Sequence, residues 1–125
     1  MSGNHFARTD RNQAEIVKAL RKEGCTVTPT HAAGRGFPDL AVGIRLAFSD
    51  VVIPFTVLME VKDWKKPHSR RKLTPAQRRW HSEWLGSRCV VETVEDALHV
   101  VRELRGGNFA VLRDPVLLRL KELGR

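Results

Sequence analysis

Apolar residues alternate strictly with polar or small ones from residue 39 to residue 48, and this pattern is typical of a β-strand with one face against a core. The next stretch, residues 51–62, is apolar on both faces for most of its length and predicts an internal strand. Pro54 near its start indicates that this end is an edge or a bulge. A tight turn at Ser49 and Asp50 would join the two strands into a hairpin.

Helical periodicity and capping residues predict helices elsewhere in the chain. The first runs from about Arg11 to Glu23, capped by Asp10 and stopped by Gly24, and the second begins at Thr74, where Thr-Pro-Ala-Gln forms a capping box, and runs to about Leu85. Two further helices are expected over residues 94–105 and 115–123, and short strands over residues 25–31, 88–92 and 108–112. The order α-β-β-β-α-β-α predicts an α/β fold in which helices flank a mixed β-sheet.

Length and composition limit the class of protein. A chain of 125 residues is expected to form one domain, and a hydrophobic content of 42% excludes a disordered basic tail. No apolar run approaches the length of a membrane span, and the first ten residues lack the apolar centre of a signal peptide, so a cytoplasmic protein is expected. Cys25 and Cys89 are accordingly expected to be reduced core residues.

The positive charge is concentrated in one segment, which we call the basic window (residues 62–79). It holds eight Lys or Arg residues and one acid, a net +7, against +8 for the whole chain. A solvated loop and a phosphate-contacting surface are both compatible with this charge. Trp80 and Trp84 near its end are spaced i, i+4, which is more typical of a buried helix face than of a base-stacking platform.

The hairpin predicts a cluster of charged side chains at its open end. If Phe48 pairs with Val51, Asp39 pairs with Glu60, and Lys62 leaves the same face of the strand as Glu60. Opposed carboxylates repel each other, and a hard divalent cation such as Mg²⁺ or Mn²⁺ would remove that penalty. The cation would hold a scissile phosphate and acidify a water molecule, which Lys62 would orient.

Each of these residues also has an ordinary structural interpretation. Asp39 after Pro38 is typical of a turn, and Glu60 with Lys62 could be a solvent-facing pair on a strand. Considered together, however, these residues are harder to explain structurally, because an otherwise apolar internal strand has no structural use for two charges on its inner face. The sequence therefore favours a functional site there.

The motifs Pro38-Asp39 and Glu60-Val61-Lys62, set in GRGFPDL, LMEVK and LTPAQ, resemble the PD-(D/E)XK nuclease superfamily. Residues 11–100 are similar in layout to the small archaeal-type Holliday junction resolvases and to the stand-alone phage VRR-NUC nucleases. The resemblance implies a restriction-endonuclease-like core, Mg²⁺-dependent hydrolysis of DNA phosphodiesters and often a homodimer that cuts four-way junctions.

The resemblance also assigns roles to residues. Asp39 and Glu60 match the metal-binding acids, Lys62 matches the catalytic lysine, and the Val61 carbonyl stands where such nucleases often supply another ligand. Glu15 matches a first-helix acid that some of these families place near the metal, although it also suits the helix dipole and can pair with Lys18. Gln77 matches a glutamine found near the lysine, yet it equally completes the capping box.

Nucleic-acid contacts are expected from exposed basic residues, and Arg35 in the glycine turn either reaches phosphate or is solvated. The expected contacts are Arg35, Lys65, Lys66, Arg70, Arg71, Lys72 and Arg78. The sequence thus predicts a structure-selective DNA endonuclease acting as a homodimer on branched DNA and not on membranes. The alternatives are a nicking or flap-type nuclease, a non-catalytic nucleic-acid-binding protein, and a nuclease acting on RNA.

Overall fold

The computed structural model describes residues 11–63, 65–67 and 72–112. Its helices are α2 (Arg11–Lys22), α4 (Pro75–Glu83) and α5 (Val94–Arg105), with 3-10 turns η1 (His31–Ala33) and η2 (Phe109–Leu112). Its strands are β1 (Thr26–Pro29), β2 (Leu40–Phe48), β3 (Val51–Val61) and β4 (Arg88–Val91). The expected Asp10 cap, the expected last helix and the side chains of Arg70 and Arg71 lie outside the described residues.

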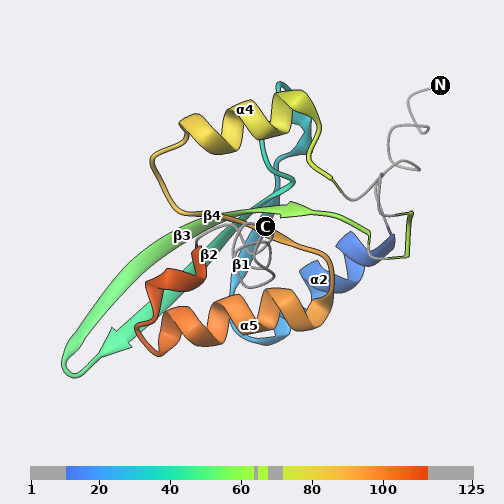
Figure 1. Ribbon diagram of the computed structural model, residues 1–125. Coiled ribbons are helices and arrows are strands. Elements are labelled where there is room, and N and C mark those ends of the chain that lie inside the picture. The colour runs from blue at the N-terminus through green and yellow to red at the C-terminus, as the bar shows by residue number, and fades with distance from the viewer. Residues whose placement is uncertain (1–10, 64, 68–71, 113–125) are drawn as a thin grey trace, which may run out of the picture.

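The four strands form one mixed sheet between layers of helix. The strand order is β1-β2-β3-β4, with antiparallel pairing from β1 to β3 and parallel pairing of β3 with β4. Helix α4 lies on one face of the sheet, while α2 and α5 lie on the other (Figure 1). The α/β class and the element order expected from the sequence are confirmed. Among the described residues, no helix has the length and apolar character needed to cross a bilayer.

The β2–β3 hairpin has the expected register. Phe48 pairs with Val51 and Leu40 pairs with Met59, so the numbers of paired residues sum to 99 along the whole ladder. Ser49 in the two-residue turn has φ of 55°, as the turns that match strand twist require. One further step along this register brings Asp39 opposite Glu60.

Pro54 lies on an open edge of the sheet. The ladder passes Pro54 without a bulge, and β4 pairs only with the last four residues of β3, from Leu58 to Val61. The edge interpretation of Pro54 is therefore confirmed. Among the described residues, β3 has a strand on both sides only from Leu58 to Val61, and Val51, Val52 and Ile53 at its Pro54 end are exposed.

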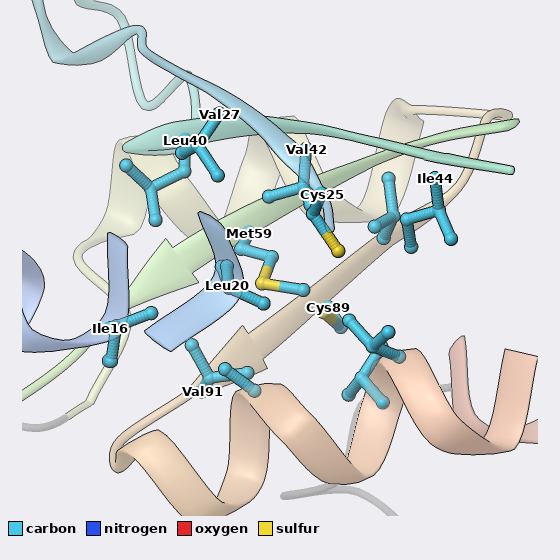
Figure 2. Close-up of a cluster of buried hydrophobic side chains, with 14 of the residues drawn as sticks. Ile16, Leu20, Cys25, Val27, Leu40, Val42, Ile44, Met59, Cys89 and Val91 are labelled. Atoms are coloured by element: carbon cyan, nitrogen blue, oxygen red, sulfur yellow. The ribbon is translucent and has the colours of Figure 1, made fainter. Parts of the chain in front are cut away.

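The hydrophobic core fills the space between the sheet and helices α2 and α5. Figure 2 shows Leu40, Val42 and Ile44 of β2 packed with Met59 of β3 and with residues of α2 and β4. Both cysteines are buried thiols outside any disulfide among the described residues, and burial raises the pKa of the Cys25 thiol. Leu58 and Val90 are also buried but lie outside this cluster. Their side chains leave the opposite face of the sheet, where α4 lies.

Residues 108–112 were expected as a small strand, and this prediction was wrong, because the segment forms η2. Asn108 Oδ1 accepts a hydrogen bond from the Ala110 N–H at 3.2 Å, which favours a tight turn over an extended chain. The centroid of the Phe109 ring then lies 5.6 Å from that of Phe55 and 6.5 Å from that of Phe48. Local side-chain bonding and aromatic packing therefore decide the conformation here.

Candidate active site

Glu60 is a buried carboxylate in the internal part of β3. Its exposed fraction is 2%, and it leaves the face of the sheet that α4 covers. A charged group at such a position is costly unless other groups stabilise it. Gln77 Nε2 donates to Glu60 Oε2 at 3.1 Å, and Lys62 Nζ lies 3.9 Å from the same oxygen. The expected charged pair is therefore not a solvent-facing pair.

Gln77 of α4 connects the helix cap to this pair of charges. Its Oε1 accepts from Lys62 Nζ at 2.8 Å and from the Thr74 N–H at 2.9 Å. Because both partners are donors, they fix the orientation of the amide and leave Nε2 to donate to Glu60. Gln77 thus completes the capping box and also contacts Glu60 and Lys62, while its part in a reaction stays a prediction.

Asp39 immediately precedes β2 and faces the end of β3. Its Oδ2 accepts the Val61 N–H at 2.8 Å, so the side chain bonds across the sheet rather than within a local turn. Its backbone carbonyl accepts the Thr30 N–H at 2.7 Å, which anchors this position to the end of β1. Asp39 and Glu60 therefore lie on neighbouring strand ends, as the register of the hairpin predicts.

A left-handed glycine turn holds this segment against α4. Gly34, Arg35 and Gly36 have φ values of 67°, 55° and 81°. A Cβ added to Gly36 would lie 2.3 Å from the carbonyl oxygen of Ala76, so only glycine allows this approach to the first turn of the helix. The glycine turn was recognised in the sequence, but its contact with α4 was not. Arg35 is exposed there.

Asn12 is a site-supporting residue that sequence reasoning missed. Its side chain is 8% exposed, and Nδ2 donates to the carbonyl oxygens of Lys62 at 2.9 Å and Glu92 at 3.1 Å. These bonds join α2 to the residues that follow β3 and β4. The sequence feature that could have revealed Asn12 is its position one turn before Ile16, on the inward face of the helix.

Glu15 lies three residues after Asn12 in α2 and is exposed. Within residues 11–63, 65–67 and 72–112, no cluster of three or more His, Cys, Asp or Glu side chains is positioned to hold a metal ion. The structure thus does not gather Glu15 with Asp39 and Glu60, and its role near a metal stays a prediction.

Apart from Lys62, the described Lys and Arg side chains of the basic window are exposed. Lys65 and Lys66 follow β3 in a turn, where the Lys65 N–H bonds Asp63 Oδ1 at 3.0 Å, and Lys72 and Arg78 are exposed near the start of α4. Lys65, Lys66 and Lys72 lie in the stretch of chain that joins Lys62 to Gln77, and Arg78 directly follows it. The cationic surface and the charged pair are therefore neighbours along the chain.

The donor set suits a hard divalent cation. Asp39 and Glu60 supply carboxylate oxygens, which Mg²⁺ and Mn²⁺ prefer. In an extended strand the N–H and C=O of one residue point to the same side, so the Val61 carbonyl is directed to the side where its N–H meets Asp39. These three residues would hold such an ion, with positions left for water and phosphate.

The chain was compared with protein-family models, with curated proteins and with solved structures, and none of the three comparisons returned a match.

Proposed function

We propose that this protein is a metal-dependent DNA endonuclease of the PD-(D/E)XK kind. The observation that carries the proposal is the part-buried network in which Gln77 bonds both the buried Glu60 and Lys62. Asp39 lies next to this network and accepts the Val61 N–H. A salt bridge with only a structural role would add little to the stability of the fold at such a position, because the cost of desolvating the two charges offsets their attraction. A site that must hold a cation and an ammonium group together accounts for the arrangement.

The residues have distinct parts in the proposed hydrolysis. A bound Mg²⁺ or Mn²⁺ would supply an acidified water and charge compensation for the phosphate. Asp39, Glu60 and the Val61 carbonyl would hold that ion. Lys62 directs its ammonium group at the attacking water and at the charge that develops on the phosphate oxygens. Water attacks phosphorus, one P–O ester bond breaks, and the leaving oxygen takes up a proton.

Gln77 is a positioning residue in this proposal. Its carbonyl oxygen holds Lys62 Nζ at 2.8 Å, and its amide nitrogen holds Glu60 Oε2 at 3.1 Å. The Glu60 carboxylate and the Lys62 ammonium group are therefore held in a fixed position relative to each other before substrate binds. Preorganisation of this kind lowers the free energy needed to reach the transition state.

The substrate we propose is branched DNA, cut by a homodimer whose two sites act on opposite strands. The exposed cations Lys65, Lys66, Lys72 and Arg78, together with Arg35, would neutralise backbone phosphates. A nicking or flap-type nuclease without junction preference uses the same residues as a monomer. The state of association in solution separates these two substrates.

The experiment is cleavage of a labelled four-way junction and of a linear duplex with Mg²⁺, by the wild-type chain and by Asp39→Asn. Asp50→Asn is the matched control, because Asp50 is an exposed acid at the far end of the same hairpin. We expect Asp39→Asn to bind DNA but not cut it, and Asp50→Asn to cut normally. Undiminished cutting by Asp39→Asn would refute the proposal.

The same assay addresses the non-catalytic alternative. A chain that binds DNA equally well with and without chelator, and cuts no substrate with Mg²⁺ or Mn²⁺, would be a nucleic-acid-binding protein. A matching RNA duplex, included in parallel, tests whether the sugar is discriminated, since backbone contacts alone carry no such information.

A further inference from the structure

Three aromatic side chains form a connected group beside the candidate active site, and we call Phe37, Trp80 and Trp84 the aromatic ledge. The rings of Trp80 and Trp84 are stacked, with centroids 4.8 Å apart and planes 19° apart. Phe37 meets them edge-on, at 5.2 Å from Trp80 and 6.2 Å from Trp84. The ledge is therefore a packed assembly in which each ring fixes the orientation of the others.

The ledge is open to solvent at one end. Trp84 is 40% exposed and its neighbour Leu85 is fully exposed at 101%. The i, i+4 spacing of the tryptophans favoured a buried helix face, and for Trp84 that prediction was wrong, because α4 ends at Glu83 and Trp84 adopts an extended conformation (ψ 124°). An aromatic ring with both rigid support and solvent exposure can accept another flat ring.

The ledge belongs to the same two segments that build the candidate active site. Trp80 lies one helical turn after Gln77, the residue that bonds Glu60 and Lys62. Phe37 is two residues before Asp39, in the glycine turn that contacts α4. The exposed side chains of Arg78 and Arg79 lie on the same helix. An exposed aromatic ring on an element that also carries exposed cations is a usual feature of a surface that binds single-stranded nucleic acid.

We propose that the aromatic ledge stacks an unpaired nucleobase of the substrate, with Trp84 as the stacking surface and the exposed Arg78 and Arg79 of the same helix on backbone phosphates. This inference rests on the proposed function and narrows its substrate to DNA with at least one unstacked nucleotide beside the cleaved bond. Because every base has a flat face, the ledge recognises unpaired structure and not sequence.

The test is DNA binding in chelator, where no hydrolysis occurs. Fluorescence anisotropy compares a blunt linear duplex, which has no unpaired nucleotide, with a duplex that carries a single-stranded arm, both with the same number of phosphates. The variants are Trp84→Ala and Trp84→Phe, with Leu85→Ala as the matched control that removes a neighbouring exposed apolar side chain. Circular dichroism establishes that each variant is folded.

We expect Trp84→Ala to bind the armed DNA roughly 5-fold to 150-fold more weakly, as loss of one base–aromatic stack predicts. Binding of the blunt duplex should be unchanged, Trp84→Phe should retain most of the preference, and Leu85→Ala should behave as wild type. Equal effects of Trp84→Ala on both DNAs, or none on either, would overturn the inference.

Self-association lost in Trp84→Ala, with DNA binding unchanged, would also overturn it and would assign the ledge to a protein contact. Failure of the proposed function is distinguishable from these outcomes. In that case no DNA is cut with Mg²⁺ or Mn²⁺, while the Trp84-dependent preference for unpaired DNA persists in chelator and supports the ledge on its own.

Discussion

Comparing Gln77→Ala with Thr74→Ala separates the helix-capping role of Gln77 from its role between the charges. Thr74→Ala removes only the cap, in which Thr74 Oγ1 accepts the Gln77 N–H at 3.2 Å. Gln77→Ala removes three hydrogen bonds at once, those to the Thr74 N–H, to Lys62 Nζ and to Glu60 Oε2. The difference between the two variants therefore measures what Gln77 contributes to the charged pair.

The magnitudes follow from the burial of the partners. Loss of a cap costs about 1 kcal/mol, so Thr74→Ala should lower the free energy of unfolding by about that amount. A hydrogen bond to a charged group contributes about 1.5–3 kcal/mol, and Glu60, at 2% exposed, cannot exchange the lost amide for bulk water. We therefore expect Gln77→Ala to cost about 3 kcal/mol or more.

The assay is urea unfolding in metal-free buffer, followed by circular dichroism and extrapolated to water. Cleavage of DNA is measured on the same preparations, and Thr74→Ala should keep the activity that Gln77→Ala loses. If the two variants have the same free energy of unfolding and the same activity, Gln77 is only a helix cap and the reasoning about the network is refuted.

Three further predictions concern the surroundings of the site. In urea unfolding, Gly36→Ala should lower the free energy of unfolding by at least about 2 kcal/mol more than Gly34→Ala does, because both glycines have positive φ but only Gly36 lies against Ala76. Equal losses in the two variants would contradict the close contact. Asn12→Ala should lower the free energy of unfolding by about 2 kcal/mol, since two hydrogen bonds are lost, and it should also slow cleavage. A change in the free energy of unfolding below about 0.5 kcal/mol would show that these bonds are not needed. Arg78→Ala should reduce by about one the slope of log binding constant against log salt for duplex DNA, and an unchanged slope would remove Arg78 from the phosphate-contacting surface.

The hairpin register was predictable because it depends on local features. Alternation has a period of two, and a two-residue turn fixes which residues pair, so the positions of Asp39 and Glu60 follow once Phe48 faces Val51. The capping box of Thr74 and Gln77 is likewise a local signal. These two features bring most of the candidate site together.

The parts that could not be predicted depend on contacts between distant segments. Asn12 bonds carbonyl groups 50 and 80 residues away, and its sequence neighbourhood carries no sign of those partners. Gly36 is required by a helix that follows 40 residues later, and the exposure of Trp84 depends on where α4 ends. Periodicity reports which face of an element is apolar, but it does not report which element will cover that face.

The central claim is that Asp39 and Glu60 hold one divalent cation between them. The most direct measurement is calorimetric titration of Mn²⁺ into the wild-type chain, Asp39→Asn, Glu60→Gln and the control Asp50→Asn. We predict a single site in the wild type and in Asp50→Asn, weakened at least about tenfold by either of the other two substitutions, because each removes a charged oxygen ligand. Equal Mn²⁺ affinity in all four proteins, or none in any, would contradict the claim.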